Sequence, residues 1–160
     1  EGCAFSSNSA RDGGAIWLTS AGAVRASAFS GNTATGNGGG VWAGAASPGP
    51  TIAACRFEGN GADGFGGGVF SPSDALATVS GCWAQGNRAS TGGGVGTQGT
   101  LLVVNSVVVG NLATTTGGGI GAGTVFGPGS LRVVNTTVAD NTAPSGGGVH
   151  SRTPLTLANS

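Results

Sequence analysis

Six acidic side chains and a single histidine could carry acid–base chemistry in this sequence. They are Glu1, Asp12, Glu58, Asp63, Asp74, Asp140 and His150. A polysaccharide lyase or hydrolase needs clustered carboxylates, often with a calcium ion, and an arginine or lysine as base. Asp12 and Asp63 occupy comparable turns two repeats apart, and no two acids share one position in adjacent repeats. We expect these acids to keep turns solvated, and we retain a carbohydrate-degrading enzyme as the alternative.

His150 and the glycine triplets fit structural roles better than catalytic ones. A Ser-His-Asp site around His150 lacks the accompanying G-x-S-x-G motif. Triplets such as Gly38 to Gly40 match fragments of phosphate-binding loops, but the chain contains no lysine to complete such a loop. Because glycine makes up 35 of 160 residues, these matches arise by chance. A repeated tight bend with positive φ is the expected use.

Three cysteines share one position of the repeating pattern: Cys3, Cys55 and Cys82. The sequence has no C-x-x-C pair and no calcium-binding G-G-x-G-x-D nonapeptide, so we expect no metal site and no cofactor. Cys55 and Cys82 belong to adjacent repeats and could approach each other, although in-register parallel strands hold side chains in poor geometry for a disulfide. We expect a column of small buried thiols, with a Cys55–Cys82 bridge as the alternative.

A column of aromatic residues follows the glycine elements of the first three repeats. Its members are Trp17, Trp42 and Phe70, and His150 occupies the same column later in the chain. If the aromatic side chains face outward, they form a strip that could stack on sugar rings or bind a partner protein. If they face inward, they belong to the core. The sequence leaves both alternatives open, because the direction of a side chain after a glycine triplet is not set by the pattern.

Two elements that recur six times in the same order must position all of these residues. The glycine-rich element ends in a β-branched residue, at Ile16, Val41, Val69, Val95, Ile120 and Val149. The other element ends eight or nine residues earlier, at Asn8, Asn32, Asn60, Asn87, Asn111 and Asn141. We expect these asparagines to stack in a ladder that satisfies the backbone of the turns, rather than to bind a ligand.

Two apolar columns accompany the asparagines and indicate short strands. One column is Phe5, Phe29, Phe57, Ala84, Val108 and Val138, and the other is Val24, Ile52, Val79, Val103, Val133 and Leu157. A repeat of roughly 26 residues cannot bury its own apolar face, whereas coils stacked every ~4.8 Å can. The sequence therefore predicts an all-β parallel β-helix of about six coils, with residues 1–160 as one domain or as a segment of a longer one.

The pairing of F-x-x-N with GGA[I/V] or GGG[I/V] resembles the repeats of polymorphic outer-membrane proteins and related right-handed β-helix surface proteins of bacteria. Phe5 to Asn8, Phe29 to Asn32 and Phe57 to Asn60 match the first half, and Gly13 to Ile16 matches the second. In later repeats valine replaces phenylalanine, as in Asn135 to Asn141. The resemblance implies the right-handed, pectin-lyase-like β-helix fold and export to the cell surface or the medium. It implies no particular activity.

Composition excludes two classes of protein. The formal net charge is zero and charged residues make up 8% of the chain, so the basic surface of a nucleic-acid-binding protein is missing. No apolar run approaches the roughly 18 to 20 residues of a transmembrane helix. Length varies between repeats mainly at Ala43 to Thr51 and at Gly121 to Ser130, which we expect to be surface loops.

We therefore expect a non-catalytic, exported structural β-solenoid, acting as a surface stalk, an adhesin-like protein or a filament subunit. Because neither end shows a polar capping segment, we expect end-to-end stacking of copies or flanking coils of a longer chain. A carbohydrate-binding or polysaccharide-degrading protein is the alternative, and a glycan or a cell-surface protein would bind the aromatic strip or the two loops. The expected location is extracellular or the bacterial cell surface.

Overall fold

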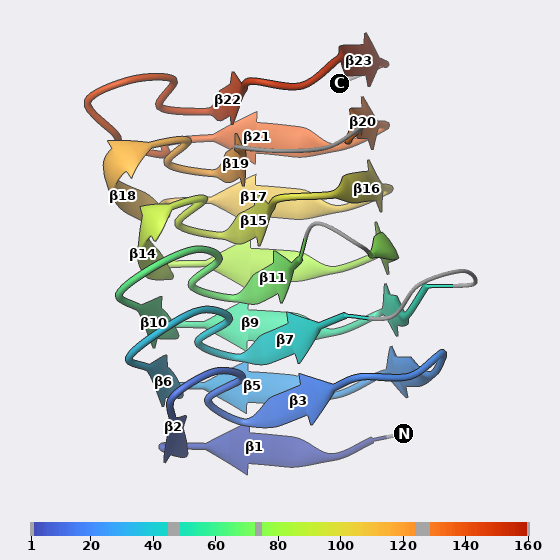
Figure 1. Ribbon diagram of the computed structural model, residues 1–160, viewed down its shortest axis with the longest axis vertical. Coiled ribbons are helices and arrows are strands. Elements are labelled where there is room, and N and C mark those ends of the chain that lie inside the picture. Colours follow the sequence, from blue (N-terminus) through green and yellow to red (C-terminus); the bar gives the residue numbers. More distant parts are fainter. Residues whose placement is uncertain (1, 45–48, 73–74, 124–128, 160) are drawn as a thin grey trace.

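The chain winds into a stack of coils whose two termini lie at opposite ends (Figure 1). The computed structural model describes residues 2–44, 49–72, 75–123 and 129–159, and within these ranges all regular secondary structure is β-strand. Each coil consists of short strands that are separated by tight turns rich in glycine and asparagine. The predicted all-β solenoid of about six coils is confirmed.

The strands form four parallel sheets that run along the axis of the stack. Sheet A contains β1 (Ala4–Ser6), β5 (Ala28–Ser30), β9 (Arg56–Glu58), β13 (Trp83–Gln85), β17 (Val107–Val109) and β21 (Thr137–Ala139). Sheet B contains β2 (Ser9–Ala10), β6 (Thr33–Ala34), β10 (Gly61–Ala62), β14 (Arg88–Thr91) and β18 (Leu112–Thr116). Sheet C contains β3 (Ile16–Leu18), β7 (Val41–Ala43), β11 (Val69–Ser71), β15 (Val95–Thr97), β19 (Ile120–Ala122) and β22 (Val149–Ser151). Sheet D contains β4 (Ala23–Arg25), β8 (Thr51–Ala53), β12 (Leu76–Ser80), β16 (Thr100–Val104), β20 (Leu131–Val134) and β23 (Leu155–Ala158).

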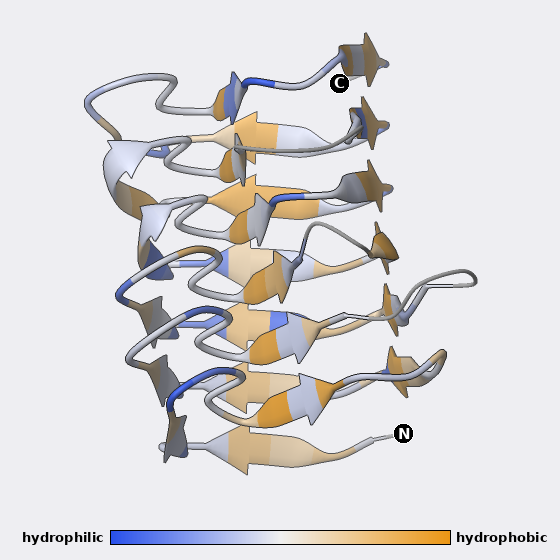
Figure 2. Ribbon diagram, viewed as in Figure 1, coloured by the Kyte–Doolittle hydropathy of each residue, from blue (hydrophilic) through white to orange (hydrophobic). Residues whose placement is uncertain are grey.

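The strands pair in the register that the repeat predicts. Phe29 lies opposite Phe5 and Phe57 in sheet A, and Val41 lies opposite Ile16 and Val69 in sheet C. Side chains alternate between the two faces of a strand, so one residue in two points into the stack. Figure 2 shows the result as hydrophobic segments at the same place in successive coils, for example along β3, β7 and β11.

A single core fills the space between sheets A, C and D. Phe29 and Phe57 are fully buried, and their rings stack with centroids 4.7 Å apart and planes 10° apart. Phe5 extends this stack on the other side of Phe29, at 4.9 Å. Burial of each such side chain contributes about 1.5–3 kcal/mol. A second, small cluster of buried alanines lies behind sheet B.

The glycine triplets have two separate reasons to be glycine. The first residue of each triplet has positive φ, for example 65° at Gly92, as the predicted bend requires. The second residue has no positive φ, but a Cβ atom on Gly93 would overlap the carbonyl oxygen of Gly118 in the next coil. The bend therefore explains only part of the pattern, and close approach of stacked backbones explains another part.

Some residues of interest fall outside the described ranges. The two variable segments, Ala43 to Thr51 and Gly121 to Ser130, include residues 45–48 and 124–128, so the expectation of surface loops is not tested at their centres. Glu1 and Asp74, two of the six acids, also lie outside the described residues.

Candidate functional site

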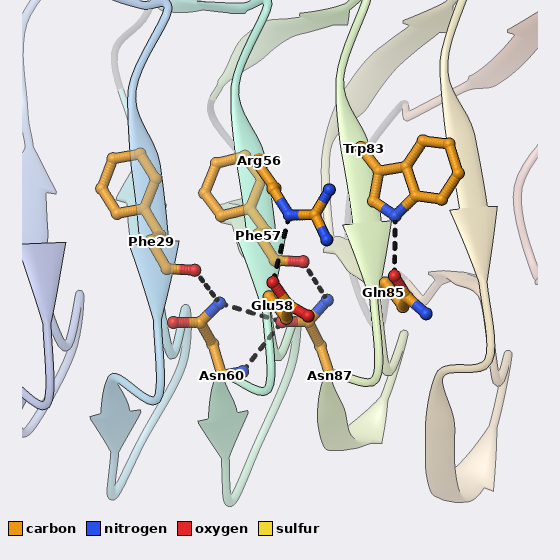
Figure 3. A network of polar contacts seen from close by, with 8 residues as sticks. All are labelled: Phe29, Arg56, Phe57, Glu58, Asn60, Trp83, Gln85 and Asn87. Carbon is orange, nitrogen blue, oxygen red and sulfur yellow. Dashed lines mark hydrogen bonds and ion pairs between the residues drawn. The ribbon is translucent and has the colours of Figure 1, made fainter. Parts of the chain in front are cut away.

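The asparagines form a continuous hydrogen-bonded ladder at the corner between sheets A and B. The Asn32 side-chain amide donates to Asn60 Oδ1 at 2.9 Å, and the same oxygen accepts the Asn32 backbone N–H at 3.0 Å. The side-chain amide of Asn60 donates one hydrogen bond to Asn87 Oδ1 and another to the carbonyl of Phe29, at 3.0 Å (Figure 3). Equivalent links join all six members: Asn8, Asn32, Asn60, Asn87, Asn111 and Asn141. Buried turn backbone is thereby paired at every coil.

A second ladder, which the sequence analysis missed, lies at the corner between sheets D and A. Here a side-chain oxygen or sulfur accepts the backbone N–H of the preceding coil, for example Ser106 Oγ from Cys82 at 3.1 Å. The same group donates to the carbonyl two residues before it, as Ser106 does to Val104 at 2.8 Å. The positions involved are Cys3, Ser27, Cys55, Cys82, Ser106 and Thr136. All six are small, polar side chains in one column of the repeat, and this shared character could have indicated the ladder.

The cysteines belong to this ladder, and none of the three forms a disulfide. Cys55 and Cys82 are buried, but Cys3 is exposed, so the expectation of a fully buried column is wrong at Cys3. The reason is that β1 is the outermost strand of sheet A, which leaves the column uncovered on that side. Side-chain hydrogen bonding with Cys82 lowers the pKa of Cys55 to about 7. The hydrogen bond to Cys55 together with burial raises the pKa of Cys82.

The aromatic column faces outward, which the sequence alone did not decide. In β7, Val41 and Ala43 point into the core, and Trp42 between them points out. Trp17 is 65% exposed, and its ring meets that of Trp42 edge to face at 5.7 Å. Phe70, by contrast, is 2% exposed, because Phe65 packs against it at 5.7 Å between centroids. The accessible part of the strip is therefore the pair Trp17 and Trp42.

A shallow cleft of about 520 Å³ lies beside Trp17 and is lined by Ala10, Arg11 and Asp12. Asp12 is held in place because its Oδ1 accepts the backbone N–H of Asn37 at 2.8 Å. Arg11 is highly exposed, and its Nε lies 3.8 Å from the Asp12 carboxylate. The cleft thus combines an aromatic face with one cation and one anion. Those are groups that can contact a sugar.

His150 lies where its column predicts, opposite Gly121 in sheet C. Its Nε2 atom is buried and has no hydrogen-bond partner among the described residues. Across the described ranges, no three histidine, cysteine, aspartate or glutamate side chains gather closely enough to hold a metal ion.

A polar network on the outer face of sheet A also escaped the sequence analysis (Figure 3). Arg56 pairs with Glu58 at 3.1 Å, and its guanidinium carbon lies 5.9 Å from the centroid of the Trp83 ring. The indole N–H of Trp83 donates to Gln85 at 3.0 Å. Trp83 directly precedes Ala84 of the inward column, so the alternation of side chains along a strand could have predicted that Trp83 faces outward. The network borders a shallow groove of about 510 Å³ over the corner between sheets D and A.

Four parallel sheets that run along one stack of coils, with an asparagine ladder at one corner, define a parallel β-helix. A family model for the right-handed β-helix region matches residues 1–143, and the chain belongs to this family. Neither the curated proteins nor the solved structures include a significant match. The described residues include no helix with the length and apolarity needed to cross a membrane. Membership of the family establishes the fold and leaves the activity open.

Proposed function

We propose that the chain serves as a rigid, non-catalytic structural β-solenoid outside the cell, as a spacer, stalk or adhesin-like element. The observation that carries this proposal is the unbroken asparagine ladder, which links every coil to the next through buried hydrogen bonds. Since each coil contacts mainly its neighbours, the length of such a rod is set by the number of coils. Six coils give roughly 29 Å at ~4.8 Å per coil.

Coil insertion tests this function. Residues 87–110 form one complete coil, because Asn111 lies 24 residues after Asn87 and takes the same place in the ladder. Three further copies of this segment should fold and lengthen the rod by about 14 Å, measured by small-angle X-ray scattering. A matched variant with three copies of residues 87–110 in reversed order controls for added chain length and should not extend the ladder.

Two results would overturn the scaffold proposal. One is an extended variant that unfolds or collapses, because a modular rod tolerates additional coils. The other is release of reducing sugar from a polysaccharide by the purified chain, beyond the amount released by heat-denatured protein. The second result would favour the carbohydrate-degrading alternative.

We also propose an extracellular or bacterial cell-surface location, supported by the F-x-x-N and GGA[I/V] repeats. Protease treatment of intact source cells should remove the chain while leaving a cytoplasmic marker intact. Protection of the chain until the cells are lysed would contradict this location.

β23, the outermost strand of sheet D, carries partly exposed leucines. Leu155 and Leu157 are 43% and 57% exposed, whereas Leu131 and Val133 opposite them are buried. We propose that a further β-coil, from another copy or from the same polypeptide, covers this surface. Sedimentation should show concentration-dependent assembly that Leu155→Glu together with Leu157→Glu abolishes. A wild-type chain that stays monomeric at all concentrations would exclude pairing between copies.

Glycan binding is a second candidate function, favoured by the exposed Trp17–Trp42 pair beside the cleft with Arg11 and Asp12. The double substitution Trp17→Ala and Trp42→Ala should abolish binding on a glycan array. Trp83→Ala, which removes a different exposed indole, is the matched control. Unchanged binding by the double variant would exclude this strip as the site.

A further inference from the structure

A hollow lies over the outer face of sheet B, and its lining includes no ladder asparagine and no tryptophan. Its volume is about 270 Å³, and it spans strands β6, β10 and β14 and reaches β18. The polar side chains around it are Thr33, Thr35, Asp63, Arg88, Ser90 and Thr114, and Ala34, Ala62 and Ala89 line it as well. This volume is close to the lower end of the range for small-molecule sites.

The hollow exists because Gly61 interrupts a row of outward side chains. Gly61 lies between Thr33 and Arg88, which are its partners on the two neighbouring strands. Its φ is not positive, and a Cβ atom there would meet only the Thr33 methyl carbon, at 4.0 Å. At Gly93, by contrast, an added Cβ would overlap backbone oxygens. Neither conformation nor packing requires glycine at position 61, so the missing side chain has the effect of opening the hollow.

The charged groups around the hollow are not used by the fold. Asp63 and Arg88 are exposed, and neither forms an ion pair or side-chain hydrogen bond within the described part of the chain. One carboxylate and one guanidinium leave the hollow without net charge. The hydroxyl groups of Thr33, Thr35, Ser90 and Thr114 also line the hollow, and hydroxyls both donate and accept hydrogen bonds. This set of groups suits a neutral ligand with many hydroxyls.

A β-bulge shapes the rim of the hollow at the fifth coil. The pairing of β14 with β18 shifts register between Ala89 and Thr91, and it is the one irregular pairing among the described strands. The Thr115 hydroxyl fixes the bulge by donating to the carbonyl of Ser90 at 2.6 Å. Thr114 lies in the bulge and lines the hollow. Bulges often redirect a side chain beside a functional site.

We propose that this hollow binds a single neutral sugar ring, free or as one residue of a glycan. Asp63 accepts hydrogen bonds from ring hydroxyls, Arg88 donates to ring oxygens, and the threonine and serine hydroxyls complete the contacts. The open rim leaves one side of the ring accessible for linkage to further sugars. This site is separate from the Trp17–Trp42 pair and does not depend on the scaffold function.

Titration of the ¹⁵N-labelled chain with methyl glucoside, methyl mannoside, methyl galactoside and N-acetylglucosamine tests the site by NMR. At least one sugar should cause saturable shifts of the Gly61 and Arg88 amides, with a Kd of about 1–10 mM. Gly61→Thr should fill the hollow and weaken binding by at least about tenfold, while the strand accepts threonine readily. Asp63→Asn and Arg88→Gln should each weaken binding by about tenfold.

Ser30→Thr, on the outer face of sheet A, is the matched control and should leave sugar binding unchanged. Circular dichroism melts show whether each variant is folded, so a loss of binding by Gly61→Thr can be separated from unfolding. The proposal is overturned by the absence of saturable shifts with all four sugars, or by undiminished binding in folded Gly61→Thr. Saturable binding of L-alanine in place of the sugars would overturn it too, because the hollow would then hold a zwitterion.

Discussion

Cys55 donates its backbone N–H to the sulfur of Cys82 in the next coil, at 3.4 Å. The Cys82 backbone N–H in turn donates to the hydroxyl of Ser106, and the Ser106 backbone N–H donates to the hydroxyl of Thr136. Thiols and hydroxyls thus take the same part in one ladder. A cysteine in this column is therefore an acceptor of a buried hydrogen bond as well as a space-filling side chain.

This role predicts different outcomes for two substitutions of similar volume at Cys82. Cys82→Thr supplies a hydroxyl, as Thr136 does in its own coil, whereas Cys82→Val leaves the Cys55 N–H without an acceptor. The valine variant should be less stable than the threonine variant by about 1–3 kcal/mol, measured by urea unfolding. Equal stability of the two variants would show that the sulfur only fills volume.

The shifted thiol pKa values predict a pH dependence of stability. The pKa of Cys55 falls from 9.0 to about 7 because of side-chain hydrogen bonding with Cys82. Between about pH 7 and pH 9 the folded chain therefore holds fewer protons than the unfolded chain, and the free energy of unfolding rises with pH, by at most about 3 kcal/mol. The raised pKa of Cys82 has the opposite effect, so stability should fall again above about pH 9.

Urea unfolding between about pH 6 and pH 10 measures this profile. The double variant Cys55→Ser and Cys82→Ser is the control, and its stability should lack the rise and the fall. If the wild-type and double-variant profiles have the same shape, thiol ionisation does not contribute.

Removal of one asparagine from the middle of the first ladder should strongly lower the free energy of unfolding. Asn60→Ala leaves the Asn32 N–H and the Phe29 carbonyl without their buried partners and should cost about 3–5 kcal/mol. Asn105→Gly is a suitable control, since Asn105 is exposed with φ of 50° and glycine adopts this conformation without strain. The control should change the unfolding free energy by less than about 0.5 kcal/mol. Comparable losses in both variants would contradict a special role for the ladder.

Sequence periodicity was sufficient to predict the coils because the apolar columns recur in register. Phe29 and Val41 both point inward, and each lies opposite apolar residues of its own column in the adjacent coils. This in-register stacking is what the repeat predicted. The direction of Trp42 was not predictable, because the backbone turns at positive φ at Gly38 and parity is lost across such a turn.

The hollow over sheet B could not be predicted for a different reason. Gly61 is one of many glycines, and the sequence does not distinguish a glycine that a close backbone contact requires from one that leaves space. Only the free volume above its Cα separates it from Gly93. The second ladder was harder to recognise, because Cys82 and Ser106 differ in type although they share one column, a small size and the capacity to accept a hydrogen bond.

Ser71 offers a stabilising substitution. Its hydroxyl is buried and lacks a hydrogen-bond partner among the described residues, which is costly in a low-dielectric core. Ser71→Ala should raise the free energy of unfolding by about 1 kcal/mol. At Thr97, the opposite residue in β15, the hydroxyl accepts the Gly99 N–H at 2.9 Å, so Thr97→Val should destabilise by about 1 kcal/mol. Destabilisation by Ser71→Ala in urea unfolding would show that its hydroxyl is paired in solution.

The contact between Arg56 and Trp83 can be measured by a double-mutant cycle. The guanidinium over the indole should give a coupling energy of about 0.5–1 kcal/mol between Arg56→Ala and Trp83→Ala, from urea unfolding of the four proteins. Because Arg56 also pairs with Glu58, the same cycle in the Glu58→Gln background separates attraction to the ring from the ion pair. A cation–π contact persists without the Glu58 charge, and the exposed ion pair itself adds at most about 1 kcal/mol. A coupling that vanishes in the Glu58→Gln background would mean that Arg56 is held over the ring only by the carboxylate.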